Sequence, residues 1–181
     1  MSHADPAYSS SALNPQTLIL AFLRLGPLII SSASLMCAWD QQNAFRSFLY
    51  PPLLKKPNHV SAHTVTEWFT PFAQPTKWVI ILAYPIALAL ALFNTIGTAG
   101  AGLHPQTKGF YFAGGVLSVL HYWFGAWSMA WNAKISCKED IGRKNEDALR
   151  GWLANNYARM LWVNLPAWVM FVCATATFIR V

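Results

Sequence analysis

Four long apolar stretches are the feature of this 181-residue chain that most limits what it can fold into. Each is about 20 residues long, which is the length of helix that crosses roughly 30 Å of hydrocarbon. A bilayer offers no water to the backbone, so such a segment satisfies its own polar groups as a helix. The sequence therefore predicts an all-α fold, an integral membrane four-helix bundle in one domain over residues 1–181. The spans are expected at residues 17–39, 78–95, 110–131 and 157–179.

The low charge content supports this fold class. Only 11% of the residues are charged and 55% are hydrophobic, whereas a soluble domain carries about 25% charged residues. The net charge of +6 raises the question of a nucleic-acid partner. The basic residues gather between the apolar stretches and form no basic face with interleaved aromatic residues, so a nucleic-acid partner is not expected.

The distribution of basic residues predicts the orientation. Connections 40–77 and 132–156 hold most of the lysines and arginines, and the opposite side has only Lys108 and Arg180. By the positive-inside rule both connections are cytoplasmic and both chain ends are lumenal, with the endoplasmic reticulum as the expected membrane. The first connection is unusually long for a small protein, and loops of that length are often functional. Its aromatic residues favour an ordered lid that lies on the membrane.

Ionisable and amide side chains at membrane depth are candidate functional groups, because burying them in hydrocarbon is costly. Asp40 closes the first span, His121 lies near mid-membrane, and Asn156 and Arg159 open the fourth span one helical turn apart. Each has a structural alternative. Asp40 could pair with Arg46, Arg159 could extend to the interface, and His121 could simply donate to a carbonyl.

Glu67 is a second candidate base, in the segment between the first two spans. The pattern Thr64-x-x-Glu67 is also a capping box, which satisfies helix N-terminal amides without any chemistry, and the two interpretations are left open. Candidates for substrate contact are Trp68, Trp127, Asn132 and Tyr157, although Asn132 could equally cap the third span.

The absent motifs narrow the chemistry. The chain has no dinucleotide fingerprint, no HExxH pair and no GxSxG elbow. The three cysteines are scattered and show no metal-ligand spacing. We therefore expect no metal and no cofactor. If the chain is an enzyme, acid–base chemistry on a lipophilic small molecule is expected, with a carboxylate base and His or Arg donors in a low-dielectric pocket.

The start of the fourth span carries a resemblance to a known family. Residues 151–161, GWLANNYARML, resemble the Trp-x-x-x-Asn-x-x-Arg signature of the fungal anthrone oxygenase-like family of small integral membrane proteins, with Trp152, Asn156 and Arg159 as the matching residues. Weaker similarity extends to Asn132, the Trp68 segment and Pro51-Pro52. The resemblance implies a four-helix membrane bundle of secondary metabolism that oxidises anthrones to anthraquinones without a known metal or flavin motif.

Three functions follow as hypotheses. The first is a membrane monooxygenase for a polyketide-type phenol. Asp40 or Glu67 removes a proton, His121 shuttles protons, and Arg159 with Asn156 stabilises the oxyanion. The second is a membrane epoxide hydrolase or cyclase that pairs an acid with a base. The third is a non-catalytic four-span partner protein, in which the polar groups join helices.

Overall fold

The computed structural model describes residues 14–49, 62–137 and 143–179, and these residues are almost entirely helical, with no strand among them. The elements in chain order are α1 (Pro15–Leu49), α2 (Ala62–Thr95), the short 3₁₀ helix η1 (Thr98–Gly100), α3 (Pro105–Leu120), the 3₁₀ turn η2 (His121–Phe124), α4 (Gly125–Ser136), α5 (Arg143–Arg159), the π-helical turn η3 (Met160–Asn164) and α6 (Leu165–Ile179). The all-α prediction is confirmed.

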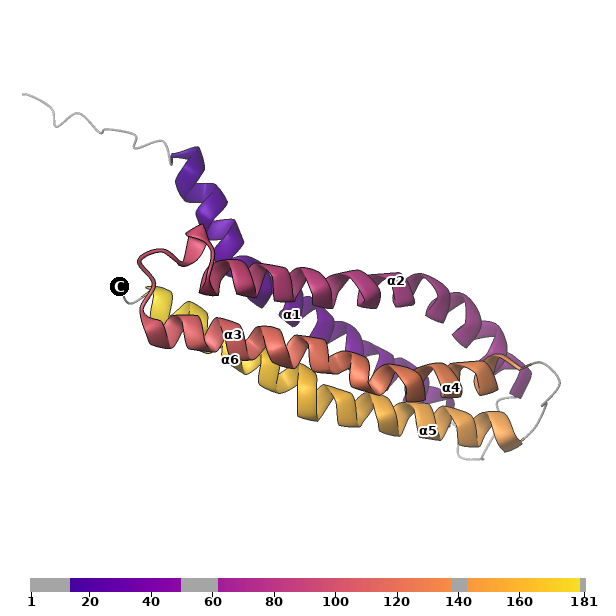
Figure 1. Ribbon diagram of the computed structural model, residues 1–181. Helices are drawn as coiled ribbons and strands as arrows, with labels where there is room; N and C mark the ends of the chain where they lie inside the picture. The colour runs from indigo at the N-terminus through magenta and orange to yellow at the C-terminus, as the bar shows by residue number, and fades with distance from the viewer. Residues whose placement is uncertain (1–13, 50–61, 138–142, 180–181) are drawn as a thin grey trace, which may run out of the picture.

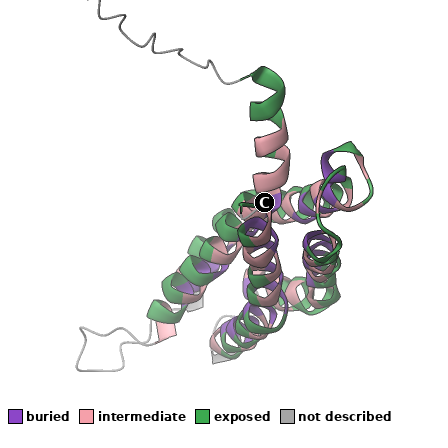
Figure 2. Ribbon diagram, turned by 90° about the vertical axis from the view of Figure 1, so that its left-hand side faces the viewer, coloured by how far each residue is buried: buried purple, intermediate pink, exposed green. Residues whose placement is uncertain are grey.

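The elements form four antiparallel rods. α3, η2 and α4 run on as one rod, and α5, η3 and α6 as another (Figure 1). α1 packs against α2 and against the last rod. α2 packs against the third rod, and the third packs against the last, so the four rods close into a ring. The first turns of α1 project beyond the bundle, as both Figure 1 and Figure 2 show.

Three helical stretches of the described residues are long and apolar enough to cross a membrane, namely Pro15–Leu49, Thr64–Thr95 and Asn145–Ile179. The predicted third span coincides with the rod of α3 and α4, whose helix is interrupted by η2. Large apolar side chains are exposed along all four rods, including Phe22, Trp78, Trp123 and Trp162. These features are consistent with a membrane protein. The orientation and the endoplasmic reticulum stay predictions.

The connection predicted over residues 40–77 is mostly helix. α1 continues to Leu49 and α2 already begins at Ala62, while the segment between them lies outside the described residues. The helices extend because their ends pack together. Phe45 of α1 contacts Phe69 of α2 and Trp152 of α5, with ring centroids 5.0 and 5.4 Å apart. The rest of the expected membrane-surface lid, residues 50–61, lies outside the described residues. The second connection is shorter than predicted, because α4 ends at Ser136 and α5 begins at Arg143.

Close helix contacts hold the opposite end of the bundle. A Cβ added to Gly114 of α3 would lie 2.6 Å from the Phe171 ring of α6, so only glycine lets these rods approach so closely. Asn94 donates to the carbonyl of Leu23, and the hydroxyl of Tyr111 donates to the carbonyl of Arg24. The Arg24 guanidinium donates to the carbonyl of Ala99. At this end of the bundle, polar side chains form hydrogen bonds that join neighbouring elements.

Candidate functional site

Three inward-facing residues of α5 begin the site. Trp152, Asn156 and Arg159 follow one another at spacings of four and three, which places them on one face of a helix. All three are buried, with exposed fractions of 7%, 1% and 6%. The signature that carried the family resemblance therefore describes a real buried stripe, directed into the bundle.

The π-helical turn η3 adds a fourth residue to this stripe. Five residues make more than one turn of an α-helix, so Asn164 would point away from Arg159 in a regular helix. The wider π turn aligns positions five apart, and Asn164 is buried at 4% exposure. Pro166 follows directly and has no N–H to donate to the carbonyl four residues earlier, which explains why the α-helical pattern breaks here. Such π turns are frequent at functional sites.

Arg159 is a buried cation with few partners. Its Nη2 donates to Asn156 Oδ1 at 2.5 Å, and its Nε is buried without an acceptor. Asn156 is itself fixed, because its Nδ2 donates to the carbonyl of Ala38 at 3.1 Å and to Gln42 Oε1 at 2.9 Å. Among the described residues no carboxylate forms an ion pair with Arg159. The Asn156 amide thus positions the guanidinium, and the other N–H groups of Arg159 remain available as donors.

A pocket of about 270 Å³ opens beside this guanidinium, between α1 and α2. Its polar lining is confined to Ser34, Cys37, Gln41, Tyr84 and Arg159. The remaining walls are apolar, and several of them, such as Ile29, Val79 and Ile86, belong to the exposed surface of the bundle. The pocket therefore opens sideways, toward the region that lipid would occupy.

A smaller cavity of about 60 Å³ lies on the other side of Arg159. Gln41, Ile80 and Arg159 line both spaces and form the wall between them. Asn132 and Trp152 line the smaller one, and the Oδ1 of Asn132 is buried without a partner. Asn132 thus lies close to Arg159 and within α4, not at a helix end, and its role as a substrate contact stays a prediction.

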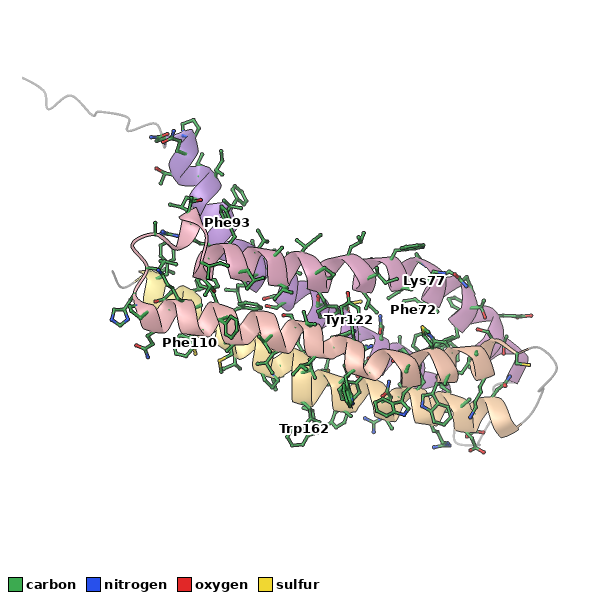
Figure 3. All side chains as sticks on the ribbon, in the orientation of Figure 1. Phe72, Lys77, Phe93, Phe110, Tyr122 and Trp162 are labelled. Atoms are coloured by element: carbon green, nitrogen blue, oxygen red, sulfur yellow. The ribbon has the colours of Figure 1, made fainter. Side chains whose placement is uncertain are left out.

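His121 joins the site through Tyr84. The His121 ring stacks on the Tyr84 ring, with centroids 3.7 Å apart. Its Nδ1 lies 3.1 Å from Asn164 Oδ1, and the Tyr84 hydroxyl lies 3.5 Å from the same oxygen. His121 begins the 3₁₀ turn η2, and the next residue, Tyr122, points from this turn to α2, where it donates to the carbonyl of Ile81 at 3.0 Å (Figure 3). His121 therefore lies behind the pocket wall formed by Tyr84.

Asp40 lies at the margin of the site. It is exposed and lines a neighbouring hollow of about 430 Å³. This hollow shares Ala33, Cys37 and Gln41 with the pocket at Arg159. Asp40 therefore lies where a molecule that enters from the end of α1 would pass.

The other predicted residues lie elsewhere. Glu67 is exposed on α2 and lines neither space beside Arg159. Trp68, Trp127 and Tyr157 are 66%, 52% and 48% exposed and line neither space. Trp162 likewise projects away from the bundle (Figure 3). Aromatic residues of this kind face outward, as an interfacial belt requires.

Sequence reasoning missed several polar residues of the site, among them Gln41, Tyr84 and Asn164. Asn164 was detectable, because an amide within an apolar span is as unusual as His121. Gln41 was detectable too, since its spacing of four from Cys37 predicts that both share one helix face. In the structure its Nε2 donates to Cys37 Sγ at 3.3 Å. The described residues contain no group of three or more His, Cys, Asp or Glu side chains that could hold a metal ion.

Comparison with known proteins finds homologues among fungal biosynthetic proteins. The chain is 28% identical over 156 residues to the probable epoxidase ScpX of Mollisia scopiformis, which covers 86% of this chain and 95% of the relative. It is 28% identical over 163 residues to the epoxidase GkaX of Penicillium citrinum, covering 87% of this chain and 95% of the relative. It is also 29% identical over 165 residues to the oxaleimides biosynthesis cluster protein N of Penicillium oxalicum, covering 88% of this chain and 90% of the relative.

No family model matches the chain, so the expected membership of the anthrone oxygenase-like family is not confirmed. No solved structure matches it either. The homologues support an enzyme of oxidation or epoxide chemistry in fungal biosynthesis. Epoxide hydrolysis and cyclisation gain no support from their names.

Proposed function

We propose that this protein is a membrane-embedded epoxidase that transfers one oxygen atom to a carbon–carbon double bond of a lipophilic biosynthetic intermediate. The observation that carries the proposal is the apolar pocket at Arg159, which opens between α1 and α2. Its lining suits an apolar guest with a few polar contact points, as in most small-molecule sites. Homologues of nearly the same length, named epoxidases, supply the reaction type.

The reaction balance defines what the pocket must do. An alkene, dioxygen, two protons and two electrons from an external reductant of the nicotinamide class give an epoxide and water. The residues of this chain would hold the double bond, exclude bulk water and stabilise the negative charge that develops on oxygen. Arg159 is placed for the last task, because preorganised donors in a water-poor site act more strongly than they do in water.

A finer version of the proposal replaces the double bond by an activated methylene as the group that is oxygenated, and it needs no external reductant. A substrate with an acidic C–H group, such as an anthrone-like phenol, loses its proton to a base, and the resulting enolate reacts with dioxygen. One methylene then becomes a carbonyl, and the second oxygen atom leaves as water. In this version Asp40 accepts the proton at the margin of the pocket. Arg159, held in place by its hydrogen bond to Asn156, stabilises the enolate oxygen.

The test compares metabolites of the native fungus with those of a strain that lacks the gene. The deletion strain should accumulate a lipophilic compound with one oxygen atom fewer than the normal product. Microsomes that contain the protein should convert that compound and incorporate label from isotopically labelled dioxygen. Label from water and none from dioxygen would contradict the proposal and favour epoxide opening. Turnover without added nicotinamide cofactor would favour the finer version.

A further inference from the structure

The Arg159 guanidinium has more hydrogen-bonding capacity than the folded chain uses. An arginine carries five N–H donors. Within the described residues Arg159 makes a single hydrogen bond, to Asn156, and its buried Nε has no acceptor. An unsatisfied charged donor in a low-dielectric interior is among the most costly features that a fold can contain.

The other intramembrane arginine shows how the chain satisfies such a group where no ligand is involved. Arg24 directs both Nε and Nη2 at the carbonyl of Ala99, at 3.3 and 3.1 Å. Its guanidinium also lies over the Phe178 ring, 4.6 Å from the centroid. Arg24 is therefore a structural arginine, whose Nε and Nη2 donate to protein and whose guanidinium packs on an aromatic ring. Arg159 differs in having an open pocket beside it where Arg24 has protein.

The lining of the pocket limits which ligand could accept hydrogen bonds from the spare donors of Arg159. Apart from a few polar atoms its walls are aliphatic, from residues such as Ile30, Ala33 and Ala83. A small hydrophilic anion would gain nothing from these walls. A neutral hydrocarbon would leave the spare N–H donors of the guanidinium without an acceptor. The ligand that satisfies both is an amphipathic molecule with an apolar body and one anionic oxygen group.

We infer that the pocket selects lipophilic acids, and that Arg159 binds an ionised oxygen group of the substrate, such as a carboxylate or an enolate, while the apolar body lies between α1 and α2. This inference rests on the proposed function, because it names the substrate class of the same site. It also fixes an orientation: the acidic group is anchored at Arg159, and the apolar body extends from it along the pocket.

A phosphate group of a membrane lipid is the other anionic oxygen that could reach a guanidinium at this depth. The pocket argues for the smaller group. Arg159 is only 6% exposed, and the pocket beside it measures about 270 Å³. A phospholipid with two chains and a phosphodiester is larger than the space that reaches Arg159. The experiment below distinguishes the two sources.

The test measures binding without catalysis, so its failure is separate from failure of the epoxidase proposal. The full-length protein is purified in phosphatidylcholine nanodiscs, and binding of radiolabelled oleic acid is measured. Methyl oleate serves as the neutral isostere and dioleoyl phosphatidic acid as the phosphate competitor. The ionised acid should bind about ten- to a hundredfold more tightly than the ester, the ratio expected of charge-assisted hydrogen bonds. Phosphatidic acid should displace it poorly.

Two variants and a control assign the preference to one side chain. Arg159→Gln should bind acid and ester equally, whereas Arg159→Lys, which keeps the charge, should retain much of the preference. Arg24→Gln, the matched control at a structural arginine, should behave as wild type. Equal binding of acid and ester by the wild-type protein would overturn the inference. A preference that survives in Arg159→Gln, or a tighter site for phosphatidic acid, would do the same.

Discussion

His121 and Asn164 contact each other at the only two places where the last two rods depart from an α-helix within the described residues. His121 opens the 3₁₀ turn η2, Asn164 closes the π turn η3, and His121 Nδ1 lies 3.1 Å from Asn164 Oδ1. Because an amide oxygen only accepts, the imidazole donates through Nδ1. The two irregularities therefore support one another and place Tyr84 as a wall of the pocket.

Replacing Asn164 with leucine should destabilise the bundle by about 1–3 kcal/mol, because the buried Nδ1–H of His121 loses its acceptor. The measurement is reversible unfolding in mixed micelles. Asn155→Ala is the matched control, since Asn155 makes a hydrogen bond of similar length to Ser128 at a less buried place. Its effect should be clearly smaller. Equal effects of the two changes would contradict a special role for the His121–Asn164 contact.

Gly114→Ala should destabilise the contact between α3 and α6, because the added Cβ would lie 2.6 Å from the Phe171 ring. Overpacking of this kind costs about 1–3 kcal/mol. Gly109 lies on the same helix, and a Cβ added there would meet no atom within 4 Å, so Gly109→Ala should be neutral or stabilising. Thermal unfolding of both variants checks the pair. A smaller residue at Phe171 should cost less stability in Gly114→Ala, where it relieves the overpacking, than in Gly109→Ala, where it only opens a cavity.

Ala83→Phe should block the pocket, because Ala83 lines it between α1 and α2. Ala89 is an exposed alanine on the same helix that lines neither space beside Arg159. Ala89→Phe should therefore leave turnover intact, while Ala83→Phe lowers it at least about tenfold, equivalent to about 1.4 kcal/mol. Product formation by microsomes measures both. Full activity of Ala83→Phe would show that the substrate binds elsewhere.

Asp40→Asn and Glu67→Gln separate the two predicted bases. Asp40 lines the hollow that adjoins the pocket, and Glu67 is exposed on α2 away from both spaces at Arg159. Loss of a general base lowers turnover by about 10²–10⁴-fold. If the finer, base-assisted reaction operates, Asp40→Asn should show such a loss and Glu67→Gln should not. The reverse order would exclude the assignment of Asp40.

The sequence was sufficient for the fold class because apolar length and charge are one-dimensional properties. The spacing of Trp152, Asn156 and Arg159 likewise identified a buried helix face, since it obeys the period of the α-helix. Asn164 was not predicted, because it joins that face only through the π turn. In a regular α-helix it would lie on another face. The connection predicted over residues 40–77 was wrong for a related reason. Contacts between rods, such as Phe45 with Phe69, hold residues from 62 onward in α2.

The outward aromatic residues show a second limit of sequence reasoning. Trp68, Trp127 and Tyr157 have the chemistry of substrate contacts, yet the side of the helix they occupy depends on how the rods turn about their axes. That rotation is set by packing between rods, through contacts such as Gly151 against the Trp131 ring. A single sequence contains no direct signal for it.

The central claim is that Arg159 acts on a guest molecule in the pocket, and its most direct test is complementation of the deletion strain. Wild type, Arg159→Gln and Arg24→Gln are expressed to equal levels, and the oxygenated product is quantified. We predict a loss of about 10²–10³-fold for Arg159→Gln, the effect of removing one preorganised donor to a developing oxyanion, and near-normal product for Arg24→Gln. Normal product from Arg159→Gln would contradict the claim.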